Sequence, residues 1–201
     1  MILIGVTGGI ACGKTEVSRV FQEKGAIILS GDLIGKEVVE RSRKVLKELT
    51  RVFGTGILNK KKQLDRRKLG GIAFASTDAK EKLNRIIHPY LLGELRKRVR
   101  SLRKRGYKGM VVVDAALIVE WGLVKELDYL IFVQSKRKNR IRRLQEHKGY
   151  SLREVFDRIK SQLPEIDKRK LADFVIKNDQ GLTELREKAS RIWVKISGKQ
   201  R

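Results

Sequence analysis

Residues 8–15 read Gly-Gly-Ile-Ala-Cys-Gly-Lys-Thr and fit the phosphate-binding pattern G-x-x-x-x-G-K-[ST]. The apolar run Ile2–Val6 before this segment predicts a buried parallel strand, and Glu16–Lys24 after it has apolar residues at helical spacing, ended by Gly25. A strand, a glycine turn and a helix start in this order are what a nucleoside triphosphate site needs. The glycines let backbone N–H groups close around phosphate oxygens, and the helix N-terminus adds partial positive charge.

The motif therefore predicts a nucleoside triphosphate site with Mg²⁺. Lys14 is expected to reach the β- and γ-phosphates, and the Thr15 hydroxyl is expected to ligate the metal ion. The residues expected to contact the nucleotide are Gly8, Gly9, Ala11, Cys12, Gly13, Lys14, Thr15 and Glu16.

Length and composition limit the class of protein. A chain of 201 residues, 41% of them hydrophobic, suits one globular domain, and it contains no apolar run of the ~20 residues that a membrane span needs. The N-terminus enters a strand at once, so we expect no signal peptide. Cys12 is the single cysteine, which rules out an intrachain disulfide and favours a reducing cytoplasm. Within the loop, Cys12 is better explained as a small residue than as a redox group.

The formal net charge of +24 has three competing explanations. A nucleic-acid binder, an enzyme for polyanionic substrates and a protein with a solvated charged surface would all show it. Aromatic residues make up only 6% of the chain and are not interleaved with the basic runs, which argues against a platform for stacking bases. The most basic run, 96–105, carries apolar residues at helical spacing and predicts a helix with a core stripe and a solvated basic face.

Short apolar runs that alternate with helical patterns predict an α/β fold with a five-stranded parallel sheet. The segment between the second and third runs is longer than one crossover needs, so we expect a helical lobe inserted at about 35–108. A basic arm at about 136–170, with breaks at Gly149 and Pro164 and a capping box at 151–154, is expected to form a lid, and 183–196 a final amphipathic helix. The five runs are Ile2–Val6, Ala26–Leu29, Met110–Val113, Tyr129–Val133 and Phe174–Ile176.

Two acids follow predicted strands at the edge where α/β proteins bind ligands. Asp32 could take a proton from an attacking hydroxyl or touch Mg²⁺, and it could also serve as the N-cap of a helix starting at Leu33. Asp114 could support the metal ion, although a lone acid after a strand is a weak signal. Arg140 and Arg143 lie on the basic arm and could close over a transferring phosphate, or simply be solvated.

Several short words of the sequence, taken in order from about Ile4 to Asn178, resemble the dephospho-coenzyme A kinase family. The segment 83–89, Leu-Asn-Arg-Ile-Ile-His-Pro, is similar to the family's Leu-Asn-x-Ile-x-His-Pro, and Ser30-Gly31-Asp32-Leu33-Ile34 falls where the family has Asp-Ala-Asp-x-Ile. Further matches are Thr7–Ile10, Gly13–Thr15, Phe53-Gly54, Ile57-Leu58, Leu64–Arg66, Leu117, Glu120, Arg143-Leu144, Arg158-Ile159, Gln162, Lys168, Ala172-Asp173, Ile176 and Asn178.

The resemblance implies a P-loop, nucleoside-monophosphate-kinase-like fold with helices on both faces of the sheet, one kinase domain over 1–201, and dephospho-coenzyme A as the substrate beside ATP and Mg²⁺. It implies that Asp32 is the catalytic base, that Arg143 is a lid arginine near the ATP phosphates, and that Asn178 lies near the adenine. Arg66 and His88 are implied as substrate contacts, with a purely structural role equally open for His88.

The chain departs from the family pattern at four positions. Ser30 replaces the first Asp of Asp-x-Asp, Ala116 replaces a proline, and His147 stands where a second lid arginine is expected; Arg140, at a position that is often Gln, could compensate. We expect a cytoplasmic kinase with no membrane partner and no specific nucleic-acid partner, and the sequence does not predict its oligomeric state. The alternatives are a nucleoside or nucleoside-monophosphate kinase and a nucleic-acid-binding P-loop ATPase.

Overall fold

The computed structural model describes all residues except 149–150, 153–154, 157–158, 160–164 and 199–201. The chain divides into two compact units, one formed by 1–30 with 106–201 and the other by 31–105. Among the described residues, no helix is both long and apolar enough to cross a membrane.

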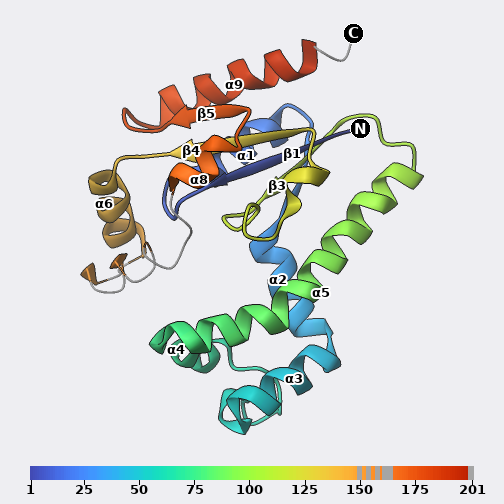
Figure 1. Cartoon of the computed structure of the whole chain (residues 1–201), viewed down its shortest axis with the longest axis vertical. Coiled ribbons are helices and arrows are strands. Elements are labelled where there is room, and N and C mark those ends of the chain that lie inside the picture. Colours follow the sequence, from blue (N-terminus) through green and yellow to red (C-terminus); the bar gives the residue numbers. More distant parts are fainter. Residues whose placement is uncertain (149–150, 153–154, 157–158, 160–164, 199–201) are drawn as a thin grey trace. The chain divides into compact units, whose positions relative to one another are not determined.

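The first unit is built on a five-stranded sheet with the order β2-β3-β1-β4-β5, in which all neighbouring strands are parallel (Figure 1). The buried residues of β1, β3 and β4 are apolar almost throughout, as expected for strands that are covered on both faces. The predicted parallel sheet is confirmed. The strands are β1 (Ile2–Gly8), β2 (Ile27–Ser30), β3 (Met110–Asp114), β4 (Tyr129–Gln134) and β5 (Phe174–Lys177).

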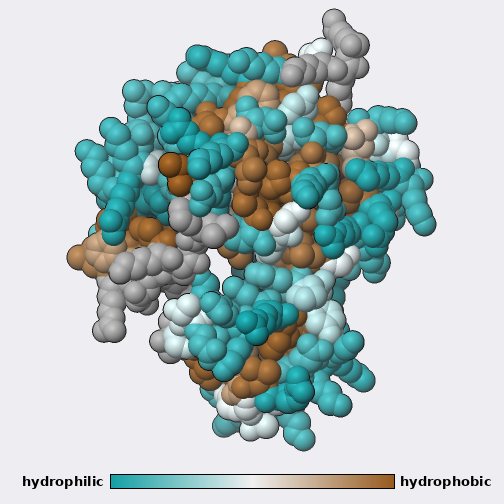
Figure 2. All heavy atoms as spheres, viewed as in Figure 1, coloured by the Kyte–Doolittle hydropathy of each residue, from teal (hydrophilic) through white to brown (hydrophobic). Residues whose placement is uncertain are grey.

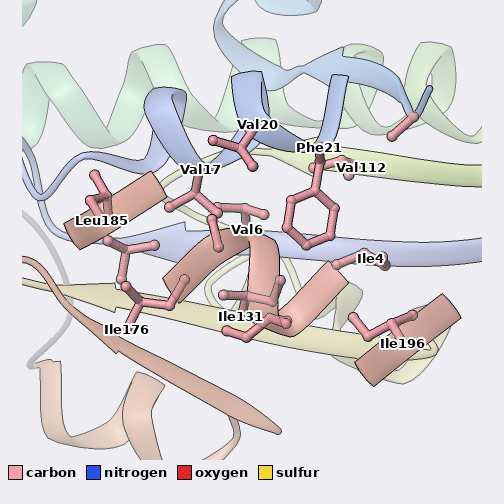
Figure 3. Close-up of a cluster of buried hydrophobic side chains, with 14 of the residues drawn as sticks. Ile4, Val6, Val17, Val20, Phe21, Val112, Ile131, Ile176, Leu185 and Ile196 are labelled. Carbon is pink, nitrogen blue, oxygen red and sulfur yellow. The ribbon is translucent and has the colours of Figure 1, made fainter. Parts of the chain in front are cut away.

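Two helices, α1 (Lys14–Glu23) and α9 (Leu182–Gly198), cover one face of this sheet. Their apolar stripes meet the inward side chains of the strands in one cluster (Figure 3). Phe21 of α1 packs edge-to-face on Trp193 of α9, with 5.3 Å between ring centroids. The predicted final helix is thereby confirmed, and its packing holds α1 against the sheet.

The remaining elements of the first unit follow β3 and β4. Those with described bounds are η2 (Leu123–Glu126), α6 (Arg137–Lys148) and α8 (Glu165–Lys170). Helix α8 lies against β1 and β4, which brings the end of the predicted lid region to the centre of the sheet. Several predictions fall outside the described residues. They are the helix breaks at Gly149 and Pro164, residues 153–154 of the capping box, the family matches Arg158 and Gln162, and the side chain of His147.

The second unit is helical. Its elements are α2 (Gly31–Arg41), α3 (Arg43–Phe53), η1 (Thr55–Ile57), α4 (Arg66–Ala75) and α5 (Thr77–Lys104). Side-chain oxygens of Ser42, Asp65 and Ser76 accept backbone N–H bonds at the starts of α3, α4 and α5. The helical lobe was predicted at about 35–108, and the compact helical unit spans 31–105.

Helix α5 contains the most basic run of the sequence. Leu91, Leu95 and Val99 are buried, whereas Lys97 and Arg100 on the opposite side are exposed. Hydrophilic residues cover the outer side of this helix in Figure 2. The predicted helix with a core stripe and a solvated basic face is confirmed.

One local prediction is wrong. Helix α2 begins at Gly31, directly after β2, and not at Leu33. Asp32 therefore lies inside the first helical turn and is not an N-cap residue. Its carboxylate still complements the partial positive charge of the helix start, and its side chain is exposed.

Candidate active site

The loop between β1 and α1 has the backbone shape that a phosphate cradle requires. Gly8, Ala11 and Gly13 have φ angles of 149°, 59° and 100°. A positive φ is easy for glycine but unfavourable for Ala11, so the surrounding structure must hold that residue in place. Gly13 is the N-cap of α1, and N–H groups of the first helical turn are the ones that an α-helix leaves available for anions.

Lys14 and Thr15 open helix α1. The Lys14 ammonium donates to the carbonyl oxygen of Gly9 at 3.0 Å, so its side chain folds back over the loop. Thr15 is exposed in the first turn. Glu16 turns the other way, because its carboxylate pairs with Arg186 of α9 and with Arg19. A nucleotide at this loop would thus meet the backbone of Glu16 and not its carboxylate.

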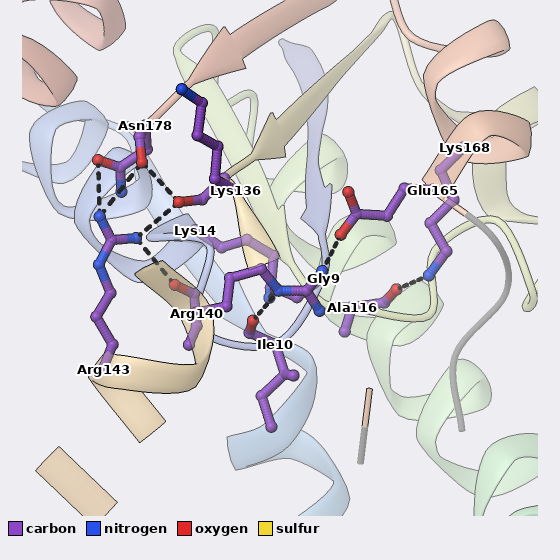
Figure 4. A network of polar contacts seen from close by, with 12 residues as sticks. Gly9, Ile10, Lys14, Ala116, Lys136, Arg140, Arg143, Glu165, Lys168 and Asn178 are labelled. Carbon is purple, nitrogen blue, oxygen red and sulfur yellow. Dashed lines mark hydrogen bonds and ion pairs between the residues drawn. The ribbon is translucent and has the colours of Figure 1, made fainter. Parts of the chain in front are cut away.

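Arg140 lies directly on the loop although it is 130 residues away in sequence. Its Nε donates to the carbonyl oxygen of Ile10 at 2.9 Å, and its guanidinium pairs with Glu165 of α8 (Figure 4). Arg140 is 5% exposed. A Cβ atom on Gly9 would lie only 2.5 Å from Arg140 Nη2, so the guanidinium packs directly against this glycine.

Arg143, about one helical turn further along α6, supports the next carbonyl of the loop. Its Nη1 donates to the Ala11 oxygen at 3.1 Å and to Ser135 Oγ at 3.3 Å. Its Nη2 donates to both the backbone and the side-chain oxygen of Asn178, each at 3.3 Å. The two arginines therefore hold successive residues of the loop, including the strained Ala11.

Asn178 completes this network from the end of β5. It is 4% exposed, and its Nδ2 donates to the Cys12 carbonyl oxygen at 2.8 Å. Its backbone oxygen also accepts a bond of 2.7 Å from Ser135 Oγ. The side chain is engaged inside the protein, so the role that this geometry supports is holding the phosphate loop.

The thiol of Cys12 is fully buried below the loop. Burial raises the pKa of this thiol, although the nearby positive charge of Arg140 acts in the opposite direction. A protonated, buried thiol is a poor nucleophile. This favours the interpretation of Cys12 as a small packing residue.

Asp114 ends β3 beside the loop strand. It is in register with Val6 of β1 and with Ser30 of β2, and it is half-buried. Ser30, which replaces the first acid of the family pattern, is therefore the direct strand neighbour of Asp114. The two positions lie at the carboxyl edge of the parallel sheet, where ligands of α/β proteins bind.

The backbone after Asp114 is held by a buried lysine. Lys168 of α8, 1% exposed, donates to the carbonyl oxygen of Ala116 at 2.8 Å and pairs with Glu120 at 2.6 Å. Thr7 Oγ1 donates to the same carbonyl oxygen at 3.2 Å. Sequence reasoning noted Lys168 and Glu120 only as matches to the family and assigned them no role; it missed Glu165 altogether, for which the sequence carries no local signal.

Asp32, Arg66 and His88 belong to the second unit. Asp32 lies in the first turn of α2, and His88 is half-buried within α5, directly before Pro89. Arg66 begins α4, and its Nη2 donates to the Lys36 carbonyl oxygen at 3.2 Å and to Glu40 at 2.5 Å.

The described residues hold no group of three or more His, Cys, Asp or Glu side chains that could bind a metal ion by themselves. Mg²⁺ in phosphoryl-transfer sites does not need such a cage, because it keeps waters and phosphate oxygens and takes one or two protein oxygens. The Thr15 hydroxyl and the Asp114 carboxylate have the donor chemistry for that arrangement, so these residues fit a nucleotide-bound Mg²⁺.

Known proteins share this architecture. A relative from Bacillus cereus, described as dephospho-CoA kinase, is 37% identical over 183 residues, which cover 91% of each chain. A structure from Thermus thermophilus superposes with a TM-score of 0.80 at 28% identity and covers 96% of each chain. The structure of dephospho-CoA kinase from Campylobacter jejuni superposes with a TM-score of 0.72 at 26% identity, covering 99% of this chain and 98% of that one.

The model of one protein family also matches residues 2–184, and its description is dephospho-CoA kinase. The match includes the phosphate loop, Arg140 and Arg143 of α6, helix α8 and Asn178. The family match agrees with the sheet order and the geometry of the phosphate loop. The chain therefore belongs to the dephospho-CoA kinase family.

Proposed function

We propose that this chain transfers the γ-phosphate of ATP to the ribose 3′-hydroxyl of dephospho-coenzyme A, which is the final step of coenzyme A synthesis. The observation that carries the proposal is the phosphate loop held by Arg140 and Arg143, within a chain that matches the family over residues 2–184. Such a loop binds a nucleotide, and family membership points to the acceptor.

The donor half of the reaction falls to the first unit. Backbone N–H groups of the loop would bind the β- and γ-phosphates, and Lys14, now bonded to Gly9, would turn to the γ-phosphate. Arg140 and Arg143 would neutralise charge that develops on the transferring group. Thr15 and Asp114 would hold the nucleotide-bound Mg²⁺, which supplies further charge neutralisation when present.

The acceptor half falls to the second unit. Asp32 would accept the proton of the 3′-hydroxyl while the new O–P bond forms and the bond to the β,γ-bridging oxygen breaks, releasing ADP. Its exposure leaves the carboxylate accessible to a substrate. Arg66 and His88 would contact the substrate from the same unit.

Three further statements belong to the proposal. Residues at about 136–170 would act as a lid, since α6 and α8 both contact the phosphate loop through side chains that a nucleotide would also meet. The protein would work in the cytoplasm, which suits its single reduced cysteine. The high positive charge would attract anionic substrates and would not serve a specific nucleic-acid partner.

Turnover with alternative acceptors tests the proposal. The purified chain would be incubated with ATP and Mg²⁺ and with dephospho-coenzyme A, adenosine monophosphate or RNA, and the release of ADP and formation of coenzyme A would be measured. We expect rapid turnover with dephospho-coenzyme A alone. Preferential phosphorylation of adenosine monophosphate would favour a nucleoside-monophosphate kinase, and ADP release driven by RNA would favour a nucleic-acid-dependent ATPase.

A further inference from the structure

Helix α8 brings two side chains of opposite charge to the phosphate-loop side of the sheet. Glu165 and Lys168 are three residues apart and so share one helix face. Lys168 is the buried member of the two, fixed by the Ala116 carbonyl oxygen and by Glu120. Because a buried, paired ammonium cannot leave its partners at low cost, Lys168 anchors the helix.

Glu165 reaches the loop itself. Its carboxylate pairs with the Arg140 guanidinium, and its Oε1 lies 2.6 Å from the place where a Cβ atom of Gly9 would be (Figure 4). The carboxylate therefore touches the backbone of the loop at the residue whose carbonyl oxygen accepts the bond from Lys14. An anionic group thus lies against the loop beside the Arg140 guanidinium.

The two partners of this ion pair differ in how firmly they are held. The Arg140 side chain is 6% exposed and is also bonded to the Ile10 carbonyl oxygen, whereas the Glu165 side chain is 37% exposed. Glu165 can therefore move into solvent while Arg140 stays on the loop. A guanidinium binds carboxylate and phosphate oxygens with the same planar fork, so a phosphate can replace the carboxylate.

We propose that Glu165 is a positioning residue of the nucleotide site: its carboxylate holds Arg140 on the phosphate loop when no nucleotide is bound, and a nucleotide phosphate replaces it. This inference rests on the proposed ATP site. Glu165 occupies the position of an anionic oxygen and keeps the desolvated guanidinium paired. Nucleotide binding then exchanges one anion for another, while Lys168 keeps α8 in place.

Direct binding measurements test this exchange. The dissociation constant of β,γ-imido-ATP would be measured by calorimetry for the wild type, Glu165→Gln and the control Glu146→Gln, which removes an acid of the same charge from α6 whose partner is Arg142. Because Glu165→Gln removes the competing anion, we expect its dissociation constant to fall about fivefold, the upper range for a partly exposed ion pair. Glu146→Gln should bind as the wild type does.

A double-mutant cycle separates the contact from a general charge effect. In an Arg140→Gln background, Glu165→Gln should no longer tighten binding, because the guanidinium for which the anions compete is gone. Glu165→Asp, which keeps the charge but is one methylene shorter, should tighten binding partly.

Four results would overturn the inference: unchanged or weaker binding in Glu165→Gln, an equal gain in Glu146→Gln, a gain that persists without Arg140, or an Asp variant indistinguishable from the wild type. Each is distinct from a failure of the proposed function, which would appear as a wild type that does not phosphorylate dephospho-coenzyme A.

Discussion

The side-chain amide of Asn178 donates a 2.8 Å hydrogen bond to the carbonyl oxygen of Cys12, so the end of β5 supports the middle of the phosphate loop. The two residues are 166 positions apart in sequence. The same Asn178 accepts two bonds from Arg143, which in turn holds Ala11. The phosphate loop, Arg143 and the end of β5 are thus connected through Asn178.

Asn178→Ala should destabilise the protein and weaken nucleotide binding together. The Cys12 carbonyl oxygen would be left buried without this donor, and Arg143 would lose one acceptor, at a cost of about 1–3 kcal/mol in the free energy of unfolding. Urea unfolding and ATP binding would measure the two effects. Asn139→Ala is a suitable control, since the Asn139 amide makes only longer contacts of 3.4–3.5 Å with Asp179. Equal stability of the two variants would contradict the prediction.

Lys14→Ala should nearly abolish transfer while the fold is retained. A charge-assisted contact to the β- and γ-phosphates strengthens toward the transition state. Its loss should raise the activation free energy by ~3 kcal/mol, which lowers kcat by more than about a hundredfold. Steady-state kinetics would measure this, with thermal unfolding as the check on folding. Lys24→Ala, at the opposite end of α1, should retain normal kcat. A Lys14 variant with more than about a tenth of wild-type kcat would refute the role.

Asp32→Asn should lower kcat by about a hundredfold or more and leave the KM for ATP nearly unchanged. The amide keeps the shape of the carboxylate but cannot accept the proton. Asp78→Asn is the matched control, because Asp78 is also an exposed acid in the first turn of a helix of the second unit. If Asp32→Asn turned over like Asp78→Asn, another group would have to be the base.

The Cys12 thiol should react slowly with iodoacetamide at neutral pH. The thiolate is the reactive form, and burial raises the pKa of Cys12, so at any pH below that pKa the reactive fraction is smaller than for an ordinary cysteine. Mass spectrometry would follow alkylation across pH, with the urea-unfolded chain as the fast-reacting reference. Alkylation of the folded protein as fast as that of the unfolded chain at neutral pH would contradict a buried, protonated thiol.

The surplus positive charge should act on substrate encounter and not on chemistry. Both substrates are polyanions, and salt screens their attraction to the protein. We therefore expect kcat/KM to fall as the ionic strength rises to about 0.1 M, where the screening length is about 10 Å, while kcat changes little. Kinetics at increasing potassium chloride would show this. Nucleic-acid binding with a dissociation constant near 10⁻⁸ M at physiological salt and a strong sequence preference would instead indicate a specific partner.

The parts of the fold predicted from sequence are those with a local signature. Apolar runs bounded by turn signals marked all five strands, and helical spacing marked α6, α9 and the basic end of α5. The start of α2 was misplaced by two residues because the chain enters that helix directly from β2, with no connecting loop to mark the boundary. The five residues after Gly8 likewise looked like a glycine turn in sequence, but the strain at Ala11 became visible only in the backbone angles.

The sequence by itself determined that this protein has a nucleotide-binding parallel α/β fold and which family it belongs to, because strand periodicity, the phosphate-loop spacing and the ordered family words are all local. Only the tertiary structure decided that Arg140 and Arg143 hold the loop carbonyls, that Asn178 braces Cys12, and that Glu165 and Lys168 face the site. These contacts depend on the sheet order, which places β4 beside β1 and β5 beside β4. In sequence, an arginine on a basic helix looks the same whether it faces water or a backbone carbonyl over 100 residues away.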